Sequence, residues 1–185
     1  IYRNKFLEKI NVLSNDRQYP DELLNLIKNA PENIVEYKAM SILLEAGIKT
    51  QKSTLVQSED EAILATKTIG KAVALKVQSP DIPHKSQAGG VVLNIDSHTN
   101  VGQQFKSMQS TISQNFPKAI IDGFLIQEMS EPGLEIILGI NNREGFGPIL
   151  MVGFGGIHVE KTRDVAFAPV PLGEDDCNEL LKKLK

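Results

Sequence analysis

The stretch ALKVQSPDIPHKSQAGGVVLNI, residues 74–95, sets two apolar segments on either side of a loop that contains proline and glycine. Residues 72–77 are almost continuously apolar, as in a strand that is covered on both faces, and residues 90–95 have the composition of a second strand. Lys76 interrupts the first of these strands. Because an ammonium group is costly to bury alone, Lys76 needs a salt bridge, an exposed end or a bound anion.

The loop between these strands has the residues of an anion site. Gly89 and Gly90 allow the backbone to approach a ligand closely, and successive N–H groups in such a turn can hold a phosphate beside a lysine charge. A glycine pair between strands is also common in a simple turn, so only its combination with Lys76 favours phosphate. The loop is therefore a candidate phosphate site.

His84 lies in the same loop, where several roles suit an imidazole. It can act as a base, bind a metal or accept a phosphoryl group as a nucleophile, and a plain surface histidine is the alternative. The other histidines, His98 and His158, lie in unrelated contexts without ligand spacing. The sequence therefore predicts no metal site.

Apolar periodicity and capping residues predict helices in the first half of the chain. Ser58 and Glu61 have the spacing of a capping box, and Gly70 is the expected left-handed end of the helix that they open. The predicted helices are two short ones within residues 3–30, one at 33–46 that ends at Gly47, one at 58–70 and one whose apolar residues are Val101, Phe105, Met108 and Ile112.

Extended segments dominate the second half. Successive strands are expected at residues 123–129, 134–140 and 148–154, and we expect them to form an antiparallel meander. This order of elements predicts an α+β fold of two lobes, with a boundary near residues 129–132 where a ligand would bind. Glu128 and Glu135 flank that boundary, and each either contacts ribose or adenine or points to solvent from an alternating strand.

Composition excludes several classes of protein. The chain has 185 residues, a formal net charge of −3 and no basic block, which argues against a nucleic-acid partner. No apolar run approaches the ~20 residues of a membrane span and no signal peptide is evident, so we expect a cytoplasmic protein. Cys177 is the single cysteine, which excludes an internal disulfide. The uncapped helical pattern at the last residues suggests a piece of a longer protein.

Two long blocks carry a family resemblance. Residues 74–95 and residues 133–167, GLEIILGINNREGFGPILMVGFGGIHVEKTRDVAF, closely resemble the ATP-grasp domain of ADP-forming acetyl-CoA synthetases. The same domain occurs in the synthetase-like region of bacterial protein acetyltransferases and in succinyl-CoA synthetase β subunits. The resemblance implies two ATP-grasp lobes with nucleotide between them. The first lobe is then 35–129, the second is an incomplete 130–185, and 1–34 is an N-terminal helical segment.

The resemblance also implies roles for individual residues. Lys76 is similar to the phosphate-binding strand lysine, and His84 to a loop histidine that relays phosphate to a phosphohistidine in the CoA-binding part. Glu128 and Met129 correspond to the hinge that meets adenine, and Glu135 to a ribose contact. The nucleotide-binding residues that it implies are Lys76, Lys85, Ser86, Gly89, Gly90, Glu128, Met129 and Glu135, with His84 as the catalytic residue.

The implied reaction is that of an acid–CoA ligase: acyl-CoA, ADP and phosphate give the acid, ATP and CoA. It requires CoA-binding and ligase domains, in the same chain or as a separate subunit. It also requires Mg²⁺, whose acidic ligands in the family follow the strand that ends near Leu172 and are absent here, so this chain alone is expected to be inactive. Where many synthetases have Phe-Arg, the chain has Phe167-Ala168. The alternative function is a catalytically silent regulatory module of a protein acetyltransferase, although a silent module would not need His84.

Overall fold

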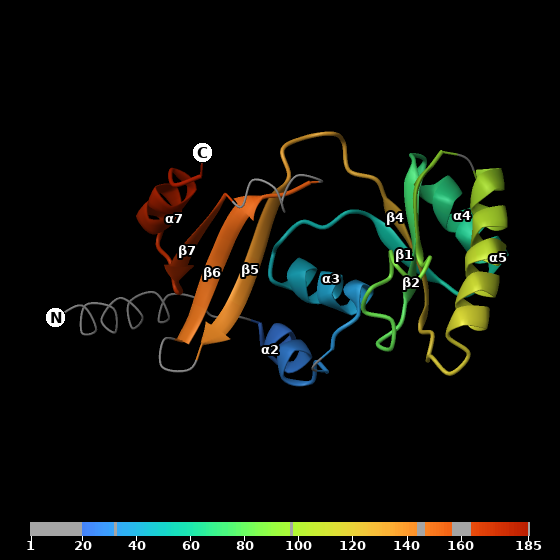
Figure 1. Cartoon of the computed structure of the whole chain (residues 1–185), viewed down its shortest axis with the longest axis horizontal. Helices are drawn as coiled ribbons and strands as arrows, with labels where there is room; N and C mark the ends of the chain where they lie inside the picture. The colour runs from blue at the N-terminus through green and yellow to red at the C-terminus, as the bar shows by residue number, and fades with distance from the viewer. Residues whose placement is uncertain (1–19, 32, 97, 144–146, 157–163, 185) are drawn as a thin grey trace. The chain divides into compact units, whose positions relative to one another are not determined.

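The computed structural model describes residues 20–31, 33–96, 98–143, 147–156 and 164–184 (Figure 1). The chain divides into two compact units, of which one is Tyr19–Glu131 and the other contains Pro132–Lys185. The first of the short helices predicted within 3–30 and the side chain of His158 lie outside the described residues. None of the described helices is both long and apolar enough to cross a bilayer.

The first unit contains a four-stranded antiparallel sheet with the strand order β1-β4-β2-β3. Its elements are α2 (Asp21–Lys28), α3 (Glu36–Glu45), β1 (Ser53–Val56), α4 (Glu59–Ile69), β2 (Val73–Gln78), β3 (Val91–Ile95), α5 (His98–Asn115) and β4 (Gly123–Glu128). The helix predicted at 58–70, the strands predicted at 72–77 and 90–95, and the helix predicted around residues 101–112 are all present.

The two faces of this sheet differ in chemistry because side chains alternate along each strand. Val73, Leu75 and Val77 of β2 are buried in one core with side chains of α4 and α5, which flank that face in Figure 1. Lys76 and Gln78 alternate with these residues along β2 and therefore point to the opposite face, against which α3 packs. This second face therefore carries polar side chains that contact α3.

Helix α4 shows how the sequence sets a boundary. The hydroxyl of Ser58 accepts a hydrogen bond from the Glu61 N–H at 3.3 Å, while the Glu61 carboxylate accepts from the Gln57 N–H at 2.7 Å. The reciprocal bond thus falls one residue before the position that a capping box predicts. Gly70 ends the helix with a φ of 71°, a left-handed conformation that favours glycine.

The second unit is a three-stranded antiparallel sheet, β5-β6-β7, with one helix. Its elements are β5 (Ile136–Arg143), β6 (Gly147–Phe154), β7 (Val165–Pro169) and α7 (Glu174–Leu181). Leu180 of α7 packs on Val152 and Ala166, which form a small core. Several apolar side chains of β5, among them Leu138 and Ile140, remain exposed.

The predicted meander is wrong in one strand. We expected 123–129 to precede 134–140 and 148–154 in one sheet, but β4 lies between β1 and β2 in the other sheet. The third strand beside β5 and β6 is β7 instead. The buried pattern of β4 explains the difference, because a strand that is buried from Gly123 to Gln127 needs neighbours on both sides.

Candidate functional site

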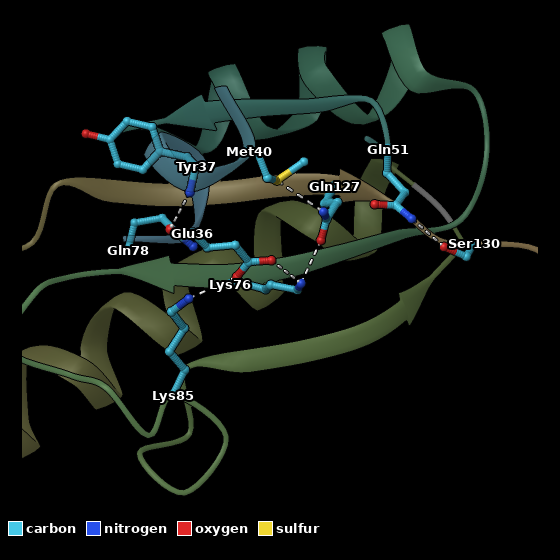
Figure 2. Close-up of polar contacts among 9 residues, drawn as sticks. All are labelled: Glu36, Tyr37, Met40, Gln51, Lys76, Gln78, Lys85, Gln127 and Ser130. Carbon is cyan, nitrogen blue, oxygen red and sulfur yellow. Dashed lines mark hydrogen bonds and ion pairs between the residues drawn. The ribbon is translucent and has the colours of Figure 1, made fainter. Parts of the chain in front are cut away.

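The polar face of the first sheet carries a pair of lysines that share one carboxylate (Figure 2). The Nζ of Lys76 on β2 lies 2.6 Å from Oε1 of Glu36, and the Nζ of Lys85 in the loop lies 2.9 Å from Oε2. Glu36 is the first residue of α3, so the three charges come from a strand, a loop and a helix end. The salt bridge that the sequence left open for Lys76 is therefore present.

A second contact fixes the strand lysine. The Nζ of Lys76 also donates a hydrogen bond to Oε1 of Gln127 at 2.6 Å, while Nε2 of Gln127 lies 3.4 Å from the sulfur of Met40. Gln127 is only 8% exposed. Lys76 is therefore held from two directions, while the hydrogen bond and ion pair found for the Lys85 side chain in the described part of the chain are both to Glu36.

The start of α3 is anchored where it meets the sheet. The Tyr37 N–H donates to Oε1 of Gln78 at 3.3 Å, and the Tyr37 hydroxyl donates to Oδ2 of Asp122 at 3.2 Å. Lys38 approaches the same Asp122 oxygen at 3.7 Å. These contacts hold Glu36, the residue before Tyr37, beside the two lysines.

The loop at 79–90 closes on itself through backbone hydrogen bonds. The Gly89 N–H donates to Ser86 O at 3.3 Å, and the Gly90 N–H donates to Lys85 O at 2.8 Å. A Cβ atom on Gly90 would lie 2.4 Å from Cγ1 of Val77, so no larger residue fits there. Both glycine N–H groups serve the loop itself in this conformation, which leaves side chains to contact an anion.

A cavity of about 420 Å³ opens at the lysine pair. The residues that line it are Glu36, Lys76, Pro83, His84, Lys85, Ser86, Gln87 and Val91. His84 and Ser86 are exposed at this cavity, whereas the side chains of Lys76 and Lys85 are partly buried. The structure thus brings together four of the residues that the sequence singled out: Lys76, His84, Lys85 and Ser86.

The electrostatics of this cavity favour an anion. Burial raises the pKa of Glu36, but hydrogen bonds and charge from Lys76 and then Lys85 outweigh burial, so the net pKa lies below its ordinary value. Two ammonium groups and one carboxylate leave an excess of one positive charge among these three residues. An excess positive charge beside an open cavity attracts phosphate.

Glu128 belongs to the opposite face of the sheet. It pairs with Val73, whose side chain lies in the core with α4 and α5, whereas Lys76 points the other way. The Glu128 carboxylate lies 3.0 Å from Nζ of Lys71, and the hydrogen bond from Lys71 lowers the pKa of Glu128. The Met129 N–H donates to Ala72 O at 3.0 Å. Neither residue lines the cavity at Lys76.

Glu135 lies in the second unit. Its side chain is exposed, and its backbone carbonyl accepts a hydrogen bond from the Gly155 N–H at 2.7 Å. A Cβ atom on Gly155 would lie 2.8 Å from Cβ of Glu135, so this glycine allows the close approach of the two strands. Glu135 thus lies directly before β5, beside the residue that follows β6.

A larger hollow of about 680 Å³ lies between α2 and α3, but its chemistry is different. Apolar side chains such as Leu26, Ile34 and Ile42 line much of it, and Lys38 is its only lysine. The smaller cavity combines two lysines with a histidine and a serine, so we take it as the candidate functional site.

The chain matches the model of the ATP-grasp domain family over residues 25–185, and it belongs to that family. More particularly, it is an ATP-grasp domain homologous to those of ADP-forming acyl-CoA ligases. It is 38% identical over 158 residues to the ADP-forming 4-hydroxybutyrate–CoA ligase of Nitrosopumilus maritimus, which is 85% of this chain and 23% of that protein.

Two further comparisons agree. The chain is 36% identical to the β subunit of ADP-forming acetate–CoA ligase II of Pyrococcus furiosus, with 82% of this chain and 64% of that subunit covered. It is similar, with a TM-score of 0.81 and 36% identity, to the acetyl-coenzyme A synthetase 1 of Ca. Korarchaeum cryptofilum solved with coenzyme A, Ca-AMPCP and HgCl+. That match covers 91% of this chain and 73% of the other.

The chain spans about a quarter of the length of the first curated relatives, with 23%, 22% and 25% of their sequences matched. Those relatives are all ligases that join an acid to CoA and form ADP. The family and the ATP-grasp fold that the sequence predicted are therefore confirmed.

Proposed function

We propose that the cavity at Lys76 and Lys85 binds the phosphate groups of ADP or ATP, and that the chain is the nucleotide-binding part of an ADP-forming acyl-CoA ligase. The observation that carries this proposal is the convergence of the two lysines on one carboxylate, at 2.6 and 2.9 Å, in the wall of the cavity. The solved relative with Ca-AMPCP supports it, since that ligand is a nucleotide analogue.

The side chains divide the work by their chemistry. Lys76 and Lys85 supply positive charge to phosphate oxygens, and the Ser86 hydroxyl supplies a neutral donor. His84 is the phosphoryl carrier in this proposal. A ring nitrogen of His84 forms a bond to phosphorus as the phosphohistidine of the partner domain loses its own, and a terminal oxygen of ADP then takes the group to give ATP.

The rest of the nucleotide contacts the chain farther along. In this proposal residues 128–129 form the hinge that contacts adenine, and Glu135 contacts ribose. Lys71 already forms an ion pair with the Glu128 carboxylate, and the Met129 N–H already donates a hydrogen bond to Ala72 O. Adenine is therefore expected to use backbone carbonyl groups of the hinge rather than the Glu128 side chain.

Magnesium is implied by the family. Within residues 20–31, 33–96, 98–143, 147–156 and 164–184, no group of three His, Cys, Asp or Glu residues could hold a metal ion. We therefore assign no step to Mg²⁺ in this chain. Its ligands are proposed to lie in the remaining part of the ligase.

The whole reaction needs more protein than this chain. We propose that CoA-binding and ligase domains, in the same chain or as a separate subunit, supply the phosphohistidine and the acyl-CoA site in the cytoplasm. The relatives support both arrangements. One is a separate β subunit, and another is a ligase several times longer than the segment that matches this chain. Without those domains this chain is expected to turn over no acyl-CoA.

Calorimetry with ADP and ATP tests the proposal. The 185-residue chain is expected to bind both nucleotides, and Lys76→Ala is expected to weaken both. If the folded chain and a longer protein that contains it both fail to bind ADP at millimolar concentration, the proposal is wrong.

A further inference from the structure

The carboxylate of Glu36 sits where an anion would sit. One of its oxygens contacts the ammonium of Lys76 at 2.6 Å and the other contacts the ammonium of Lys85 at 2.9 Å. All three side chains line the same cavity. A phosphate group, which has several terminal oxygens, can bridge two ammonium groups in the same way.

We propose that Glu36 is an internal competitor of the nucleotide, whose carboxylate leaves Lys76 and Lys85 when phosphate binds and so sets the affinity of the site. This inference rests on the proposed function, because it names the group that phosphate must replace. Glu36 is a positioning residue in this proposal and takes no part in bond making.

Charge is the first reason for displacement. The pKa of Glu36 lies below its ordinary value, so its carboxylate is ionised at neutral pH, where nucleotide phosphates are ionised as well. A phosphate that reached Lys76 and Lys85 with Glu36 in place would put two anions side by side in a partly buried site. Like charges at that spacing repel strongly when little water separates them.

The surroundings of Glu36 allow it to move. Its side chain is 28% exposed, so the carboxylate has a route to water, and no side-chain cap closes the start of α3. Lys76 does not depend on Glu36 alone, because Gln127 accepts a hydrogen bond from it at 2.6 Å. Departure of Glu36 therefore leaves the strand lysine in position for phosphate.

The alternative is that Glu36 is a clamp whose only role is to hold the lysines. The competitor role and the clamp role predict opposite changes in anion affinity for Glu36→Gln. If Glu36 is only a clamp, Glu36→Gln disorders the lysines and weakens anion binding. If Glu36 competes, Glu36→Gln removes the repulsion and strengthens anion binding, although the ligand-free protein loses an ion pair.

Titration calorimetry of the 185-residue chain with pyrophosphate, and separately with ADP, distinguishes them. Pyrophosphate lacks adenine and ribose, so it reports on the lysine pair alone. We expect Glu36→Gln to bind pyrophosphate about tenfold more tightly than wild type. The matched control is Glu59→Gln, which breaks the 2.7 Å ion pair with Lys106 on α4 and α5 and is expected to leave the affinity unchanged.

A second measurement uses the wild-type protein and needs no variant. The ¹³C shift of the Glu36 carboxyl group is followed against pH with and without saturating pyrophosphate. Release from Lys76 and Lys85 is expected to raise the pKa of Glu36 towards its ordinary value. A pKa that stays lowered in the complex overturns the proposal, as does equal or weaker pyrophosphate binding by folded Glu36→Gln.

The outcomes also separate this inference from the function on which it rests. Wild-type binding of ADP together with weaker binding by Glu36→Gln leaves the nucleotide site in place and rejects the competitor. Absence of binding by folded wild type and folded variant alike, in this chain and in a longer protein that contains it, rejects both.

Discussion

Lys76 and Gln127 lie on the same face of the four-stranded sheet, on neighbouring strands, with Nζ of Lys76 2.6 Å from Oε1 of Gln127. Gln127 pairs directly with Ala74, two residues before Lys76, which makes the lysine its diagonal neighbour. The contact therefore follows from the register of β2 and β4. A shift of one residue would instead present the carboxylate of Glu128 to this face.

Replacement of Gln127 by Met is expected to weaken ADP binding without unfolding the chain. Met keeps the length of the side chain but removes the oxygen that orients Lys76. One hydrogen bond to a charged group is worth about 1.5–3 kcal/mol, but the bound phosphate itself still contacts the Lys76 ammonium, so a loss of several fold is expected. Calorimetry measures it. Ser130→Ala, which removes an exposed 2.9 Å hydrogen bond with Gln51, is the control and should change nothing.

Lys76→Ala is expected to cost more ADP affinity than Lys85→Ala. Lys76 is held by Gln127 as well as Glu36, whereas Lys85 lies in the loop with Glu36 as its only side-chain partner found within the described residues. A charge-assisted phosphate contact is worth about 1.5–3 kcal/mol, so about a tenfold loss or more is expected for Lys76→Ala. Lys106→Ala removes a lysine from the far face as a control. Equal and small effects at both positions would contradict the assignment.

Gly90→Ala is expected to destabilise the first unit by about 1–3 kcal/mol, as overpacking does. The new Cβ atom would meet Cγ1 of Val77 at 2.4 Å and Lys85 O at 3.2 Å. Thermal unfolding measures the change. In a Val77→Ala background the same substitution should cost less, because the clashing methyl group is gone. Gly139→Ala, whose Cβ would lie 3.5 Å from Met151 Cε, is the tolerated control.

Glu36 should make the stability of the chain depend on pH. Its pKa is lowered in the folded state, so its contribution is complete above the unfolded value of about 4.3 and is lost as pH falls through the folded value. Thermal midpoints of wild type and Glu36→Gln are therefore expected to differ by a constant amount at neutral pH. The gap should close as the pH falls below about 4. A gap that grows towards acid pH would contradict the sign.

His84→Ala tests the phosphoryl carrier. In a protein that also contains the CoA-binding and ligase domains, this variant is expected to lose ATP/ADP phosphate exchange while its ADP affinity stays within a few fold. Acid-labile ³²P labelling follows the phosphohistidines directly. Lys106→Ala, which lies outside the cavity, keeps the imidazole and should retain exchange. Full exchange by His84→Ala would show that His84 is not the phosphoryl carrier.

Local patterns predicted the elements well. The helix at 58–70 has its cap, its apolar spacing and its terminal glycine within one segment, and the structure has α4 there. The strand at 72–77 is apolar enough to be recognised without its neighbours, and β2 lies inside the sheet. Such elements depend on residues close in sequence, which a single sequence displays.

Partners distant in sequence were not predictable in the same way. Glu36 was overlooked because an acidic residue in the first turn of a helix is ordinary and needs no ligand to explain it. Gln127 was overlooked because only the β2–β4 register places it beside Lys76, and Glu128 one residue later has the more reactive side chain. The misplaced strand β4 has the same origin, since its partners are β1 and β2 rather than the strand that follows it.

The central position of β4 also affects how the first sheet folds while the chain is being translated. β4 is the last strand of its sheet to be translated, yet it is the strand that joins β1 to β2. At a translation rate of roughly 5–20 residues per second, β4 is synthesised several seconds after β1, so β1 lacks its pairing strand for that time. During that interval the nascent chain can form the β2–β3 pair but cannot close the sheet. Chaperones that shield apolar segments can bind β1 before residue 123 appears.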